Sequence, residues 1–280
     1  MLIRLGDCST NWDGLPCCVA NVVAILMTIG IVSVSQASLV GYENFDSYTT
    51  NSQLNGGSGG IGWSGSWGNV SGVQPTVMTG MDSRMADLSF SGSQDQSRIG
   101  RSLGGTFGGT GTTTWVRFNG QYSNFSGVSL TPYGGLSLAT GDSESLRIGK
   151  FNGTTNWSVG LTTPDISNSA VSVTSLSDIW VRINHLDGAD SVSLWVNPAN
   201  MTSEANLGTA SATLNTLDIS FNRILLLGDR GSTTSQGHTW NFDNIRVGTS
   251  FGAMSAVPEP TSLCLVGLLL SGLGFVRRRV

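Results

Sequence analysis

Apolar and polar residues alternate one by one through much of the middle of this chain. The clearest case is the segment 179–185, where Ile179, Val181 and Ile183 fall on one side and Trp180 and Arg182 on the other. A period of two places successive side chains of a β-strand on opposite faces. We therefore expect a strand here, with its aliphatic face in a core.

The next alternating segment, 191–197, has Val192, Leu194 and Val196 on one face. The turn-rich stretch 186–190 separates it from the first, so the two strands should form a hairpin. We expect further strands at 39–45, 84–90, 97–103, 113–121, 134–139, 145–151, 156–160, 219–227 and 239–247, and an edge strand within 167–177. Many short strands without an amphipathic helix predict an all-β fold, an antiparallel two-sheet sandwich or jelly roll.

The N-terminal region has another pattern, an uncharged apolar run over residues 19–34. Ser35 and Ala37 place small residues where a signal peptidase reads them, so we expect a signal helix and cleavage after Ala37. Asp7 and Asp13 depart from the positive leader that such a signal usually has. An uncleaved N-terminal anchor is the alternative, and a wrongly assigned start codon would explain the departure.

The C-terminal region joins a turn, an apolar run and a basic end. Val257-Pro258-Glu259-Pro260 is followed by the uncharged run 263–276 and by Arg277, Arg278 and Arg279. The prolines cannot continue a helix, whereas the Leu-rich run predicts a transmembrane helix with its arginines in the cytoplasm. The run is shorter than the roughly 20 residues of a typical span. A plain membrane anchor is the simpler interpretation.

This three-part order resembles the PEP-CTERM sorting signal of exported bacterial proteins, over the tail from about Val257 onward. The resemblance implies that Val257, Pro258, Glu259 and Pro260, with the three arginines, form the sorting motif. It also implies a partner, the membrane protease-transpeptidase called exosortase. The membrane-anchored precursor would then be released or attached at the cell surface or in its polysaccharide matrix.

These features divide the chain into four parts. We expect a signal peptide over 1–37, a β-sandwich over 38–250, a linker with the Pro-Glu-Pro motif over 251–260, and a transmembrane helix with its basic tail over 261–280. The four cysteines, Cys8, Cys17, Cys18 and Cys264, all lie in the terminal parts. The sandwich should therefore have neither a disulfide nor a thiolate zinc site.

Two groups of residues in the body resemble exported concanavalin A-like, or laminin G-like, sandwiches. The stretch 43–48 (Glu-Asn-Phe-Asp-Ser-Tyr) and the Gly-rich 61–67 are similar to the opening of such domains, whereas 195–198, 224–228 and 242–249 are similar to their closing strands. The resemblance implies the same sandwich fold. Some related folds bind calcium and others hydrolyse glycans.

Composition excludes one class of partner. Only 11% of the residues are charged, the formal net charge is −4, and Lys150 is the one lysine of the body. Without a basic patch we expect no nucleic-acid binding.

Candidate chemistry is sparse. Sandwich glucanases need several acids alternating along one strand, but the chain offers only the pairs Glu43/Asp46 and Asp142/Glu144, which we interpret as solvated turn acids. His185 and His238 have no partner at metal-ligand spacing and should be structural. Loop carboxylates leave calcium open as a cofactor, although no ligand set is defined; these are Asp187, Asp190, Asp229 and Asp243.

The tryptophans are the best candidates for binding. Trp63 and Trp67 lie in the Gly-rich segment 55–68, where exposed indoles could stack on sugar rings or could close the end of the sandwich. Tryptophans within strands should pack. The sequence thus favours an exported, non-catalytic β-sandwich sorted through its C-terminal signal. A carbohydrate-binding module is the alternative, and a glycan hydrolase with an unrecognised site is a third.

Overall fold

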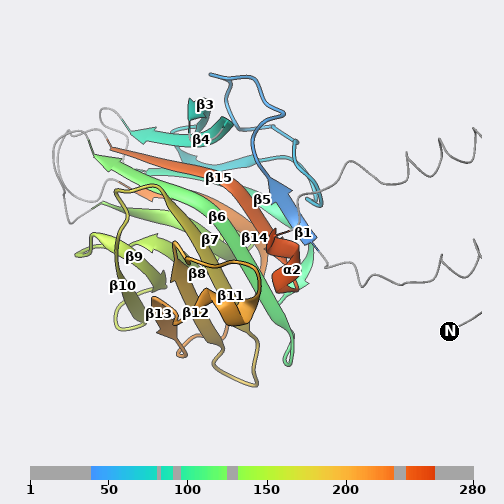
Figure 1. Ribbon diagram of the computed structural model, residues 1–280. Coiled ribbons are helices and arrows are strands. Elements are labelled where there is room, and N and C mark those ends of the chain that lie inside the picture. Colours follow the sequence, from blue (N-terminus) through green and yellow to red (C-terminus); the bar gives the residue numbers. More distant parts are fainter. Residues whose placement is uncertain (1–38, 81–82, 91–95, 125–131, 230–237, 256–280) are drawn as a thin grey trace, which may run out of the picture. The chain divides into compact units, whose positions relative to one another are not determined.

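The computed structural model describes residues 39–80, 83–90, 96–124, 132–229 and 238–255; the predicted signal helix and transmembrane helix lie outside them. Within these ranges the fold is all-β, with two antiparallel sheets that form a sandwich (Figure 1). This confirms the fold class expected from the alternating pattern. None of the described helices has the length and apolar character needed to span a membrane.

The larger sheet has eight strands in the described part of the chain. Its path runs β13 (Ala212–Leu214), β12 (Ser191–Val196), β11 (Ser177–Asn184), β6 (Thr113–Asn124), β15 (His238–Gly248), β4 (Ser83–Phe90) and β3 (Thr76–Gly80), and β1 (Leu39–Glu43) also pairs with β15. The predicted hairpin is confirmed, since Ile179 faces Val196 and Asn184 faces Ser191 across β11 and β12.

The smaller sheet has seven strands among the described residues. It runs β10 (Ile166–Ser172), β9 (Asn156–Gly160), β8 (Ser143–Lys150), β7 (Tyr133–Thr140), β14 (Phe221–Asp229), β5 (Gln96–Phe107) and β2 (Gly68–Gly72). The edge strand expected within 167–177 is β10, at one end of this sheet. Three short strands that the pattern did not indicate, β2, β3 and β13, complete the two sheets.

Strand β15 is the centre of the larger sheet. It pairs with β6 along one side, whereas the other side is shared by β4 and β1. Its residues 238–242 face β4, and Ile245 to Gly248 face β1. Between these halves the register with β6 shifts, and Asn244 has a φ of 51°. This irregularity is a β-bulge, which lets one long strand serve two neighbours.

The core lies between the sheets and is built from the inward face of each strand. Ile179, Val181 and Ile183 belong to it, as do Val192 and Leu194, all at most 1% exposed. Opposite them, β7, β8 and β14 contribute aliphatic side chains, and Trp157 and Trp240 pack edge to face at 5.9 Å between ring centroids. The alternation of the sequence therefore maps directly onto the buried face.

Two short helices lie outside the sheets: the 3₁₀ turn η1 (Glu204–Leu207) and α2 (Phe251–Ser255). Helix α2 occupies the first half of the segment expected to be a linker. Its residues Ala253 and Met254 are buried against the outer face of the larger sheet.

Candidate functional site

The Gly-rich loop, residues 55–67, joins the two sheets along one edge of the sandwich. Its Ile61 pairs with Tyr42 of β1 in the larger sheet, and its Trp63 pairs with Leu103 of β5 in the smaller sheet. The backbones of Ile61 and Tyr42 exchange two hydrogen bonds of 2.9 Å. The loop therefore closes the gap between the sheets at this edge.

The glycines of this loop are required by its close approach to β1. Gly60 has a φ of +74° and Gly62 a φ of +81°, in the left-handed region that side-chain-bearing residues avoid. A Cβ on Gly60 would lie 2.3 Å from the carbonyl oxygen of Tyr42, and one on Gly62 would lie 2.2 Å from that of Val40. The glycines at these two positions are therefore required by the close packing of the loop backbone against the backbone of β1.

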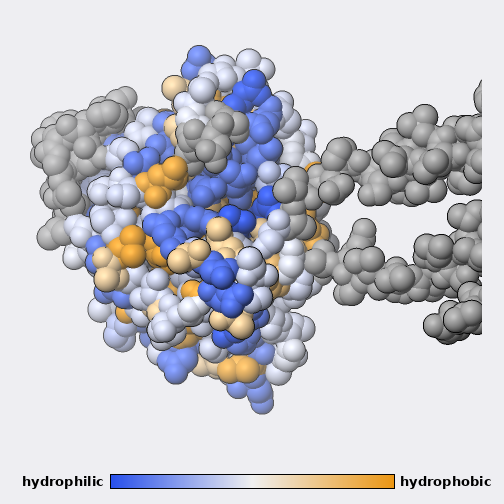
Figure 2. Space-filling model, viewed as in Figure 1, coloured by the Kyte–Doolittle hydropathy of each residue, from blue (hydrophilic) through white to orange (hydrophobic). Residues whose placement is uncertain are grey.

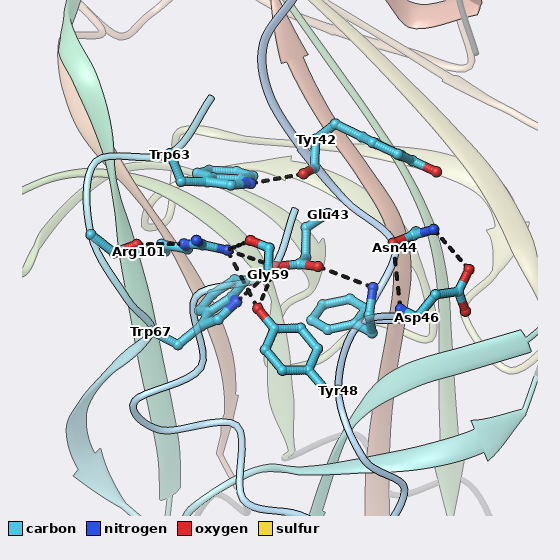
Figure 3. Close-up of polar contacts among 11 residues, drawn as sticks. Tyr42, Glu43, Asn44, Asp46, Tyr48, Gly59, Trp63, Trp67 and Arg101 are labelled. Carbon is cyan, nitrogen blue, oxygen red and sulfur yellow. Dashed lines mark hydrogen bonds and ion pairs between the residues drawn. The ribbon is translucent and has the colours of Figure 1, made fainter. Parts of the chain in front are cut away.

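Beneath the loop lies a fully buried ion pair (Figure 3). Glu43 comes from β1, and its Oε2 lies 2.7 Å from Nη1 of Arg101 on β5. Their side chains are 0% and 3% exposed. Glu43 was expected to be a solvated turn acid, and that expectation is wrong. The loop that shields it arrives from a different part of the chain.

Every oxygen of the Glu43 carboxylate has a donor. Its Oε1 accepts from the backbone N–H of Phe45 at 3.1 Å, and Oε2 accepts from the Tyr48 hydroxyl at 2.7 Å and from Nε1 of Trp67 at 3.2 Å. Burial, followed by the charge of Glu43, raises the pKa of Tyr48 above its usual value. Tyr48 therefore remains a hydrogen-bond donor to the carboxylate.

Arg101 in turn holds the loop backbone. It donates from Nη1 to the carbonyl of Gly59 at 2.5 Å and from Nε to that of Gly65 at 2.9 Å. Its guanidinium also lies over the rings of Trp63 and Trp67, at 5.3 and 5.9 Å from their centroids (Figure 3). Because the charge is neutralised and the Nε and Nη1 donors are occupied, this cluster is suited to holding the edge closed.

The structure places the two candidate sugar-binding tryptophans in that cluster. Trp67 is 1% exposed and stacks near Phe45, whereas Trp63 is half-buried and donates from Nε1 to the carbonyl of Tyr42 at 2.9 Å. Of the two roles that the sequence allowed for this residue, closing the end of the sandwich describes Trp67. Its indole, as placed, offers no face to a sugar.

Sequence reasoning did not identify Arg101, although a signal for it existed. Ile99, Arg101 and Leu103 alternate on the same face of a predicted strand, and the two neighbours are core residues. A charged residue at an inward position requires a buried partner. The alternation could therefore have indicated an internal acid, but not which one.

The remaining acid pair lies at the seven-stranded sheet. Glu144 accepts from Arg98 at 3.1 Å and from Arg147 at 2.8 Å, and its side chain is 14% exposed. Asp142 is exposed and pairs with Arg223. The interpretation as a solvated acid therefore fits Asp142 but not Glu144.

The first histidine has a structural place. His185 is buried, with Nδ1 at 3.0 Å from Asp190 and Nε2 at 3.0 Å from the hydroxyl of Thr114. Asp190 also accepts from the backbone N–H groups of Leu186 and Ile219, both at 2.9 Å. This candidate calcium ligand is therefore already occupied by three donors of its own chain.

The other candidate ligands are spread over the domain. Asp187 is exposed, Asp229 accepts from the Tyr133 hydroxyl at 2.8 Å, and Asp243 accepts from the backbone N–H of Asn244 at 2.7 Å. His238 is buried beside the ring of Tyr122. Over the ranges that the structure describes, no group of three or more His, Cys, Asp and Glu residues is placed to hold a metal ion.

A second apolar cluster fixes the last described element of the chain. Trp115, Trp180 and Trp195 lie on the outer face of the larger sheet, and Phe251 of α2 packs on the first two with centroid distances of 5.3 and 5.2 Å. Arg117 lies 4.5 Å above the ring of Trp180 and donates to the carbonyl of Met254 at 3.0 Å. The expected packing role of these tryptophans is confirmed.

The predicted processing residues lie outside the described ranges. These are Ala37 at the N-terminal end and, at the C-terminal end, Val257, Pro258, Glu259, Pro260, Arg277, Arg278 and Arg279. The family model of the PEP-CTERM protein-sorting motif matches residues 256–279. The chain thus has this motif, which marks an exported, membrane-anchored precursor and is in general processed by an exosortase.

Comparison with solved structures supports the sandwich fold. The binding domain of botulinum neurotoxin serotype C1 is similar with a TM-score of 0.51 at 11% identity, over 76% of this chain and 49% of that one. An alginate lyase from polysaccharide lyase family 7 has a TM-score of 0.42 at 10% identity, over 61% of this chain and 81% of the lyase. This chain spans about half the length of the neurotoxin domain. No curated protein matches the sequence.

Proposed function

We propose that this chain is the precursor of an exported, non-catalytic β-sandwich protein, which an exosortase processes at residues 257–260 and delivers to the cell surface or its polysaccharide matrix. The observation that supports this proposal most directly is the sorting motif at 256–279. It begins at the residue after α2, the helix that packs on the outer face of the larger sheet.

The chemistry of the body supports a non-catalytic role. General acids and bases in enzymes usually have pKa values tuned toward neutrality and face a cleft. Here the buried acids Glu43 and Asp190 are each saturated by donors of the same chain. Their partners Arg101 and His185 are buried with them. These groups stabilise loops and turns.

The sorting proposal is tested by replacing Pro258, Glu259 and Pro260 with alanine in a host that has an exosortase. We expect the wild-type protein to lose its C-terminal segment and the variant to retain it, as measured by intact mass. Expression of the wild-type chain in the same host without exosortase is the control and should give the unprocessed mass. Identical processing of variant and wild type would refute the assignment of these residues.

A further inference from the structure

The outer face of the larger sheet has two unlike halves. One half holds the tryptophan cluster, which α2 and η1 cover. The other half, here called the polar face, consists of six side chains from β4, β6 and β15: Asp87, Ser89, Asn119, Gln121, Thr239 and Asn241. Figure 2 shows hydrophilic surface over these three strands.

The register of the sheet arranges these side chains in rows. Asn241 of β15 lies between Gln121 of β6 and Asp87 of β4, and Thr239 lies next to Ser89 in the adjacent row. Neighbouring strands are about 4.8 Å apart, and alternate residues along a strand about 6.8 Å. The polar face is therefore a regular array of amide, hydroxyl and carboxyl groups.

The central strand of this array is recessed. Thr239 is 4% and Asn241 8% exposed, whereas Asn119 and Gln121 beside them are half-buried and Ser89 is exposed. Burial also raises the pKa of Asp87, although its carboxylate accepts from Ser89. The recess follows from the side chains of β4 and β6, which flank the central strand on both sides.

One acceptor in the recess is unused. Oδ1 of Asn241 is buried and has no hydrogen-bond partner among the residues that the structure describes. An unpaired buried acceptor is unfavourable because it has lost its water without gaining a partner, and the great majority of such groups in proteins are satisfied. This oxygen lies on the central strand of the array, and a donor from a bound ligand would satisfy it once the flanking side chains move apart.

We propose that the polar face is a binding site for a neutral polysaccharide chain. Each sugar hydroxyl both donates and accepts a hydrogen bond, and Asn, Gln, Ser and Thr side chains do the same. The six side chains include no cation, and the carboxylate of Asp87 would repel an acidic glycan. A protein partner is disfavoured because interface centres are rich in aromatic and apolar anchors, which this face lacks.

Two arginines lie near the polar face, Arg117 and Arg246, but both interact with other groups and so do not change this charge argument. Arg117 makes a bidentate pair with Asp178 at 3.0 and 2.9 Å. Arg246 lies 4.6 Å above the ring of Tyr42 and is 8% exposed.

The test is affinity electrophoresis of the detergent-solubilised full chain through gels that contain dextran, mannan, galactan or laminarin, with polygalacturonate as the acidic probe. We expect at least one neutral polysaccharide to retard the protein. Asn119→Ala and Asn241→Leu should each weaken that retardation about 3- to 10-fold, the equivalent of one or two neutral hydrogen bonds.

The matched control is Asn152→Leu, the same chemical change at an exposed turn on the other sheet, which should leave retardation unchanged. Asn119→Ala removes a half-buried side chain that makes no hydrogen bond within the described ranges, so it tests the site even if Asn241→Leu disturbs folding. Failure of all four neutral polysaccharides, retardation by polygalacturonate alone, or full retention in the Asn119→Ala variant would each overturn the proposal. None of these outcomes bears on C-terminal processing.

Discussion

Replacement of Arg101 by methionine should strongly destabilise the domain. The substitution leaves the Glu43 carboxylate fully buried and without its counter-ion, and it also releases the carbonyls of Gly59 and Gly65. Removing one partner of a buried ion pair typically costs about 3–5 kcal/mol of unfolding free energy. For a domain of this size that corresponds to a fall in Tm of about 6–20 °C.

The assay is urea unfolding of the full chain, followed by tryptophan fluorescence. The double variant Glu43→Gln/Arg101→Met should lose less than the sum of the two single variants, because it removes the uncompensated charge together with its partner. The control is Arg182→Met, which breaks the more exposed pair with Glu204 and should cost at most about 1 kcal/mol. A loss below 1 kcal/mol for Arg101→Met, or additive losses in the double variant, would refute this reasoning.

Two further predictions concern the loop backbone and the buried lysine. Gly62→Ala should destabilise the domain more than Gly56→Ala in the same urea assay. Both residues have a positive φ, but only a Cβ on Gly62 would meet Val40. Equal losses of unfolding free energy would contradict the packing argument. Burial lowers the pKa of Lys150 from 10.5 to about 8. Between these pH values the unfolded chain binds more protons than the folded chain, so the free energy of unfolding should rise as the pH increases. The rise should be at most about 1.4 kcal/mol per pH unit. Lys150→Met should flatten that slope in unfolding experiments across this pH range, and an unchanged slope would contradict the assignment.

The regular part of the fold was predictable because its information is local. Alternation over 179–185 and 191–197 identified both strands of the hairpin and their inward faces, since each strand of the sandwich buries one side. Strand β13 was missed because three residues are too few to show a period. Strands β2 and β3 do not alternate: β2 has a single apolar side chain, Val70, and β3 has Val77 and Met78 side by side.

The loop cluster could not be predicted because its contacts join distant segments. Glu43 and Arg101 are 58 residues apart, and the loop that covers them lies between them in sequence. Glu43 lies near the end of the predicted strand 39–45, and its burial depends on glycines that permit the loop to cross the gap. Trp67 was assigned two roles for the same reason: the sequence located its loop but not the surface the loop would meet.

The position of β15 also affects the order in which the domain can assemble. Among the strands that the structure describes, β15 alone joins β6, β4 and β1, so without it the larger sheet falls into separate pieces. Its partner Leu39 stands at the beginning of the described chain, and the contact with Gly248 spans almost the whole domain. Contacts of such long range form late in folding. During export, therefore, the sheet can close only when β15 has crossed the membrane, and residues 249–255, which include α2, are all that separates this strand from the sorting motif.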